Sequence, residues 1–183
     1  MKKILIILLS LNSITISAQD TTPQTTKHLL KGNLLITPGL EYERAITKNT
    51  TISLQLGTEL GGIENEELNE TRFVVYPVLD IDYRYYYNFK RRARKGKNTS
   101  NNNANYFGLA NTYTHTDTLF DDIDPDDAYY ISIAVVYGLQ RTYWKKLNLR
   151  FEAGAGYGFS DTQETFVPVL NFTLGWVFWS QSK

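Results

Sequence analysis

Residues that commonly carry out chemistry are few in this 183-residue chain, which has two histidines and no cysteine. His115 and Asp117 stand two positions apart, so in an extended strand their side chains would share one face. A histidine oriented by a carboxylate can act in hydrolysis only when a nucleophile lies beside it. No serine stands two positions from His115. We therefore expect a solvated histidine at a rim and predict that the chain is not an enzyme.

An acidic run is the second candidate, because carboxylate oxygens bind hard cations such as calcium. The run contains five aspartates, namely Asp121, Asp122, Asp124, Asp126 and Asp127. It lacks the central glycine and the closing glutamate of an EF-hand loop. We expect a hydrated loop of mutually repelling charges, with calcium binding as the weaker alternative, and we expect no cofactor.

Six lysines and arginines occur between positions 90 and 97 without an acidic residue. Such a run could contact lipid phosphates or anionic cell-wall polymers, and a solvated turn is the simpler interpretation. The whole chain has 19 basic and 19 acidic side chains. Because a general nucleic-acid binder relies on excess positive charge, we expect no nucleic-acid partner.

These residues must be positioned by strands, because apolar and polar residues alternate with period two over most of the chain. In residues 129–143, for example, Ile131 and Ile133 lie on one face, while Ser132 and Ala134 lie on the other. Similar alternation predicts strands at 50–62, 72–89, 128–144, 147–160 and 165–179, and a further strand is expected at 106–119, where the pattern does not distinguish the two faces. The pattern predicts an all-β protein.

Residue size indicates which face of these strands points inward. The polar faces consist largely of small residues and amides, whereas the surface of a water-soluble sheet would be rich in lysine and glutamate. The apolar faces end in tyrosine, tryptophan or phenylalanine, as do the aromatic girdles of membrane barrels. We expect a transmembrane β-barrel with its apolar face outward. A soluble, lipocalin-like ligand-binding barrel is the alternative.

The links between the predicted strands alternate in charge. Eleven acidic residues and no basic one occupy the links at 63–71, 120–127 and 160–164. Nine basic residues and no acidic one occupy the intervening links. Every second link therefore belongs at the same end, as an up-and-down meander requires, and we expect the acidic links to face the outside.

Residues 28–47 decide the number of strands. Thr37-Pro38-Gly39-Leu40 has the residues of a type II turn, in which proline supplies the negative φ and glycine the positive one. We therefore predict two strands, 28–36 and 40–47, which completes an eight-stranded antiparallel barrel. One long strand through Pro38 is the alternative and leaves seven clear strands.

Charged residues on the polar faces should meet inside this barrel. An eight-stranded barrel is about wide enough for side chains to fill it, and buried charges are normally paired. We expect a filled polar lumen, with a cation or proton pathway as the alternative. The predicted network consists of Glu41, Glu43, Glu59, Asp80, Asp82, Arg84, Arg150 and Glu152.

The N-terminus has the features of an export signal. A cationic start and a short apolar stretch precede small residues that suit cleavage before Gln19. We predict a signal peptide at 1–18, a short mature segment at 19–27 and the barrel domain at 28–183. Together with the strand pattern, this predicts a bacterial outer-membrane location, with membrane lipid as a partner.

Three stretches stand out in the mature chain, namely 40–44 (LEYER), 82–88 (DYRYYYN) and 174–179 (LGWVFW). Together they resemble small outer-membrane barrel proteins of Bacteroidota and the broader OmpA/OmpX-like class. The resemblance implies a terminal signal for the barrel-assembly machinery and a type of barrel without a particular chemistry. We expect a structural or surface-interaction role, with a lipid-modifying enzyme as the alternative and the external partner left open.

Overall fold

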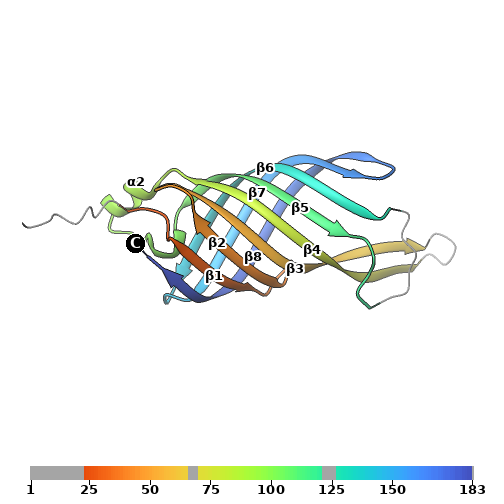
Figure 1. Ribbon diagram of the computed structural model, residues 1–183, viewed down its shortest axis with the longest axis horizontal. Coiled ribbons are helices and arrows are strands. Elements are labelled where there is room, and N and C mark those ends of the chain that lie inside the picture. The colour runs from red at the N-terminus through yellow and green to blue at the C-terminus, as the bar shows by residue number, and fades with distance from the viewer. Residues whose placement is uncertain (1–22, 66–69, 121–126, 183) are drawn as a thin grey trace, which may run out of the picture.

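The computed structural model describes residues 23–65, 70–120 and 127–182, so the predicted signal peptide lies outside the described residues. Eight antiparallel strands form one closed barrel in which each strand pairs with its neighbours in the chain and β1 pairs with β8 (Figure 1). The strands are β1 (His28–Asn33), β2 (Gly39–Ala45), β3 (Thr50–Asn65), β4 (Glu70–Tyr86), β5 (Asn105–His115), β6 (Tyr129–Tyr143), β7 (Leu147–Ser160) and β8 (Glu164–Gln181). The predicted eight-stranded, all-β fold is confirmed.

A short helix, α2 (Phe89–Arg94), and a 3-10 turn, η1 (Ser100–Asn102), lie between β4 and β5. This part of the prediction was wrong, because the strand expected to reach position 89 ends at Tyr86 and the basic run is partly helical. Phe89 turns inward and packs on the ring of Tyr86, with the two ring centroids 5.4 Å apart. Burial of this apolar side chain favours the turn over a longer strand. None of the described helices is long and apolar enough to span a membrane.

The β1–β2 hairpin confirms two strands in residues 28–47 and excludes the seven-strand alternative. The predicted type II turn is wrong, because the left-handed backbone lies at Ile36, with φ of 66°, and Gly39 already belongs to β2. Gly39 lies so close to the backbone of Leu56 and Gly57 that any side chain there would collide with β3. Close strand contact therefore requires the glycine.

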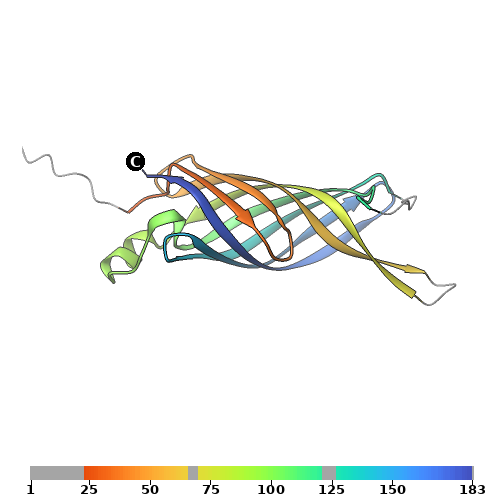
Figure 2. The ribbon, with the colours of Figure 1, turned by 90° about the horizontal axis from the view of Figure 1, so that it is seen from below.

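The barrel wall extends less far toward the acidic end at β1 and β2, because these strands are shorter than their neighbours. β2 pairs with β3 only as far as Gly57, and β1 pairs with β8 only as far as Gly175. β3 nevertheless continues to Asn65, and β8 already begins at Glu164. Beyond the β1–β2 turn, β3 and β8 therefore diverge (Figure 2).

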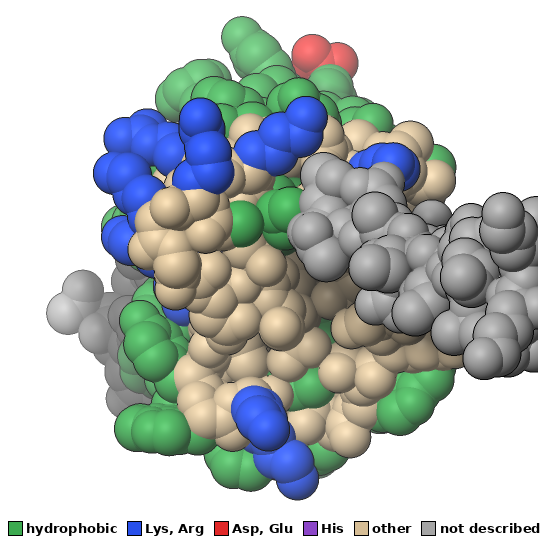
Figure 3. All heavy atoms as spheres, turned by 90° about the vertical axis from the view of Figure 1, so that its left-hand side faces the viewer, with side chains coloured by type: hydrophobic (Ala, Val, Ile, Leu, Met, Phe, Trp, Pro, Cys, Tyr) green, Lys and Arg blue, Asp and Glu red, His purple; other side chains and the backbone are tan. Residues whose placement is uncertain are grey.

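The links at the two ends of the barrel carry opposite charge, as predicted. α2, the β2–β3 and β6–β7 links and the C-terminus lie at one end, which we call the basic end (Figure 1). Lysine and arginine side chains gather over it (Figure 3). Asp127, Asp161 and Glu164 belong to the opposite, acidic end. The other aspartates of the acidic run lie outside the described residues.

Candidate functional site

Most of the charged residues predicted for the lumen meet in one buried network. Glu41 lies at its centre, 2.7 Å from Arg84 Nη1, 3.0 Å from Arg150 Nη1 and 3.1 Å from Lys31 Nζ. Each of these four side chains is at most 5% exposed. The full network consists of Lys31, Glu41, Glu43, Asp82, Arg84, Arg150 and Glu152.

The remaining carboxylates each combine a cation with a neutral partner. Glu43 Oε2 lies 3.4 Å from Lys31 Nζ, and its Oε1 accepts a hydrogen bond of 2.7 Å from Tyr86 Oη. Asp82 accepts a bond of 2.6 Å from Arg84 Nη2 and one of 3.4 Å from Ser53 Oγ. Three cations thus face four carboxylates, and hydrogen bonds from hydroxyl and amide groups help to stabilise the surplus negative charge.

Glu152 joins this network from β7. Its Oε1 accepts a hydrogen bond of 2.6 Å from Tyr106 Oη, and its Oε2 lies 3.5 Å from Arg150 Nε. Asn171 on β8 donates to the same Oε2 at 3.3 Å. The network therefore joins strands on opposite sides of the barrel, which side chains can do only across a narrow lumen.

Lys31 is the member that the sequence analysis missed. It is completely buried and lies directly opposite Glu41 in the β1–β2 pairing. A turn centred between Pro38 and Gly39, as predicted, would have set Lys31 opposite Ile46 instead. Lys31 and the inward-facing Asn33 are two positions apart, so in a strand they share one face, and this spacing could have identified Lys31.

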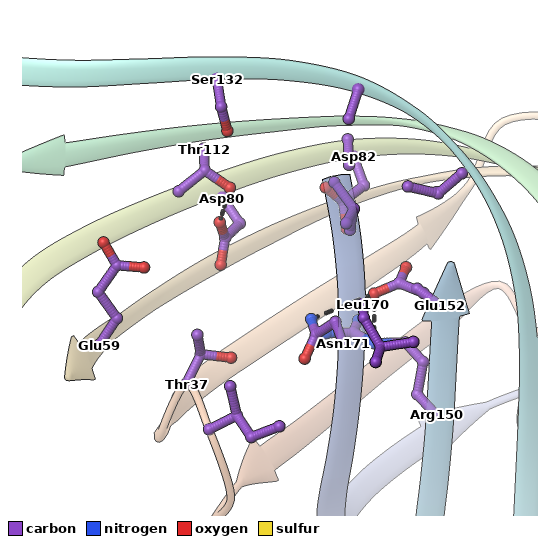
Figure 4. Close-up of a pocket in the computed structure, with 15 residues that line it drawn as sticks. Thr37, Glu59, Asp80, Asp82, Thr112, Ser132, Arg150, Glu152, Leu170 and Asn171 are labelled. Atoms are coloured by element: carbon purple, nitrogen blue, oxygen red, sulfur yellow. Dashed lines mark hydrogen bonds and ion pairs between the residues drawn. The ribbon is translucent and has the colours of Figure 1, made fainter. Parts of the chain in front are cut away.

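Two predicted members, Glu59 and Asp80, face the same interior but do not join the network. Asp80 accepts a hydrogen bond of 2.6 Å from Thr112 Oγ1, and Glu59 accepts one of 2.8 Å from Thr114 Oγ1. Within the described part of the chain, neither carboxylate has an ion-pair partner. Both line a cavity of about 200 Å³ between the network and the acidic end (Figure 4).

The lumen is hollow toward the acidic end and filled toward the basic end. A second hollow, of about 350 Å³, is lined by Glu59, Tyr76 and Tyr130 and lies nearer the acidic end. Tyr86, Phe89 and Tyr106 fill the opposite half as one buried cluster. The prediction of a filled lumen therefore holds for the half at the basic end alone.

Residues of the β4–β5 link close the basic end from within, and we call Asn101, Asn102, Asn103 and Ala104 the inner cap. All four are at most 6% exposed. Asn102 Oδ1 accepts a hydrogen bond of 2.7 Å from the backbone N–H of Thr26. Asn103 Nδ2 donates to a backbone carbonyl of β6 at 3.2 Å, and Gln140 Nε2 donates to the carbonyl of Asn101 at 3.0 Å. The cap is thereby attached both to the N-terminal segment and to the wall.

The His115–Asp117 pair lies at the end of β5 that faces the acidic end. His115 Nε2 is 3.0 Å from Asp117 Oδ2, and the two side chains are 48% and 70% exposed. This geometry is that of a solvated pair at a rim. The described residues contain no group of three or more histidine, cysteine or acidic side chains placed to hold a metal ion.

Comparisons with family models, with curated proteins and with solved structures found no significant match. The resemblance to outer-membrane barrels of Bacteroidota therefore stays a prediction, and the site is interpreted from its own geometry.

Proposed function

We propose that this protein is an integral outer-membrane β-barrel with a structural or surface-interaction role, whose buried charge network serves as a polar core and not as a channel. The distribution of exposure carries this proposal. Leu60, Phe73 and Leu170 are 71%, 80% and 75% exposed, whereas Lys31 and Arg84 are 0% and 1% exposed. A soluble protein of this size rarely exposes so much contiguous apolar surface.

Hydrocarbon around the barrel accounts for a structure in which apolar side chains are exposed and charged side chains are buried. Burying apolar surface is worth about 25 cal/mol per Å², so a ring of outward leucines and phenylalanines is stabilised by lipid and not by water. Where all eight strands are paired, they satisfy one another's backbone hydrogen bonds, which is the condition for crossing a bilayer. Export by the predicted signal peptide and insertion by the barrel-assembly machinery belong to the same proposal.

Exposed aromatic side chains support the placement of two membrane boundaries. Toward the basic end, Tyr85, Tyr137 and Trp179 are 44%, 38% and 49% exposed. Toward the acidic end, Tyr157 and Phe166 are 58% and 60% exposed. Amphipathic rings prefer the headgroup level on both sides of a bilayer.

The closed basic end argues against a diffusion pore. A solute entering from the acidic end would meet the charge network, then the buried ring of Tyr106, and then the inner cap. Side chains of this kind fill eight-stranded barrels, in contrast to the open lumen of larger porins.

Fractionation combined with a heat-modifiability gel tests the proposed function. We expect the protein in the outer-membrane fraction, solubilised only by detergent, with different gel migration before and after boiling. Recovery of a folded protein in the soluble fraction without detergent would contradict the proposal and favour the lipocalin-like alternative. Altered acyl chains after incubation with lipopolysaccharide would instead favour the lipid-modifying enzyme.

A further inference from the structure

A hollow of about 350 Å³ lies at the basic end, where α2 meets the adjoining ends of β4, β5 and β6. We call it the cationic pocket, because five of its nine lining residues are basic and none is acidic. The five are Arg91, Arg92, Lys95, Lys97 and Arg141. The pocket lies among the lysine and arginine side chains of this end, which Figure 3 shows from outside.

Two guanidinium groups of the cationic pocket are held in place by uncharged acceptors. Arg92 Nη2 donates to the carbonyl of Asn98 at 3.0 Å and to Asn103 Oδ1 at 2.8 Å. Arg141 Nη2 donates to Asn105 Oδ1 at 2.5 Å. These bonds fix the orientation of both side chains but do not neutralise their charge. The site is therefore preorganised for an anion.

The electrostatics of Arg92 also favour a bound anion. Burial of its guanidinium, together with the positive charge of Arg141, lowers the pKa of Arg92 from its ordinary value. No acidic side chain among the described residues lines the cationic pocket to compensate this positive charge. A phosphate between the two side chains would do so, because guanidinium groups bind phosphate oxygens through paired, charge-assisted hydrogen bonds.

The surroundings of the pocket distinguish a lipid phosphate from a free one. Tyr87 and Tyr137 line the pocket, with their hydroxyl oxygens 3.2 Å apart, and their rings pack with Phe107 on the outer wall. Phe107 is 53% exposed. The cationic pocket thus continues directly into an exposed aromatic surface, which suits a ligand with a phosphate at one end and hydrocarbon at the other.

We propose that the cationic pocket binds the phosphate of a phospholipid in the membrane leaflet at the basic end, with the acyl chains lying against Tyr87, Phe107 and Tyr137. This inference rests on the proposed membrane location. Arg92 and Arg141 bind the phosphate oxygens, and the more exposed Arg91, Lys95 and Lys97 add positive charge around them.

Native mass spectrometry of the folded protein in dodecyl maltoside, titrated with dioleoylphosphatidylglycerol, tests the proposal. We expect the wild-type protein to retain one phospholipid. R92Q/R141Q removes both proposed guanidinium contacts and should bind the lipid at least about tenfold more weakly, because a single charge-assisted contact already accounts for about that factor. K90Q/R94Q is the matched control. It also removes two positive charges, both from α2, the helix that carries Arg92, and neither residue lines the pocket. Dioleoylglycerol, which has no phosphate, serves as the control lipid.

Equal weakening in both double variants would show diffuse attraction and overturn the proposal, as would the absence of a retained phospholipid. Displacement of the lipid by inorganic phosphate at equal concentration would assign the pocket to a free anion instead. If R92Q/R141Q does not fold, as judged by heat modifiability, R91Q/K95Q replaces it, because both side chains are exposed. A protein that is soluble without detergent would contradict the proposed function. A barrel that needs detergent but binds no phospholipid would contradict this inference alone.

Discussion

Arg84 contacts three carboxylates, those of Glu41, Asp82 and, at 3.6 Å, Glu43, and an aromatic ring inside the barrel. It lies 2.7 Å from Glu41 Oε1 and 2.6 Å from Asp82 Oδ2, and its Cζ lies 5.6 Å from the ring centroid of Tyr106. A buried ion pair often adds little net stability, but removal of one partner leaves the other charge uncompensated at a cost of about 3–5 kcal/mol. The network should therefore respond strongly to the loss of a single cation.

Arg84→Leu is expected to lower the temperature at which the purified protein loses its folded gel migration. The physical reason is that Asp82 loses its closest cation and Glu41 loses one of three. Arg44→Leu is the matched control, because Arg44 is exposed on the neighbouring outward face of β2. An unchanged midpoint for Arg84→Leu would contradict the role of ion pairing in this core.

The short β1–β2 hairpin is the element that makes the barrel asymmetric. Its turn exposes three consecutive aliphatic side chains, with Leu34, Leu35 and Ile36 at 64%, 44% and 54% exposure. A turn that faced water would carry polar residues, whereas these side chains suit contact with hydrocarbon. Past this turn, the facing edges of β3 and β8 have no strand partner among the described residues.

Hydrogen exchange of the protein in detergent should reveal these free edges. We expect amides at 59–65 and 164–173 to exchange faster than those at 130–139, because β6 is paired on both sides there. The hollow lined by Glu59 and Asp80 also touches Leu170 and Asn171 of β8, so we expect water in it to reach both edges. Equal protection of all three segments would mean that the two edges close on each other.

On the scale of the whole molecule, the part of the lumen formed by the described residues is hollow toward the acidic end and closed at the basic end. The charge network and the cluster of Tyr86, Phe89 and Tyr106 follow one another along it. These two groups, joined by hydrogen bonds from Tyr86 and Tyr106, block the same path in succession, ahead of the inner cap. The loss of either one should leave the other in place.

Planar-bilayer recordings test this arrangement. We expect no conductance steps for the wild-type protein or for Phe89→Ala, since the ion pairs of Glu41 remain intact in that variant. Protein-free bilayers and bilayers with a known porin are the controls. Steps in the wild-type recordings would favour the cation pathway over a polar core.

The positions of the chain ends predict one orientation for the proposed membrane barrel. Both chain ends of the barrel lie at the basic end (Figure 1), which places that end on the periplasmic side if both termini stay there. Because the chain has no cysteine, single-cysteine variants can be labelled without background. Thr162 and Lys90 are exposed at the acidic and basic ends, respectively.

A membrane-impermeant maleimide should label Thr162→Cys on intact cells and Lys90→Cys only after the outer membrane is permeabilised. The wild-type protein is the unlabelled control, and detergent-solubilised variants show that each thiol is reactive. Labelling of Lys90→Cys on intact cells would reverse the proposed orientation.

The amino-acid sequence by itself determined the strands, the alternating charge of the links and the inward and outward faces of most strands, with the faces of 106–119 left open. Period-two alternation is a local property of each strand, so it can be recognised without knowing which strand lies opposite. The two strands in 28–47 were found even though the predicted turn was misplaced by a few residues. Strand number depends on the presence of a turn, whereas register depends on its position.

Only the tertiary structure decided which charges meet. Arg150 and Glu41 are 109 positions apart and touch because the sheet closes on itself. The observed position of the β1–β2 turn set Lys31 against Glu41, and the closed barrel left Glu59 and Asp80 beside a cavity and Phe89 packed in the lumen. Contacts across a barrel depend on register and closure at once, and neither is a property of any single strand.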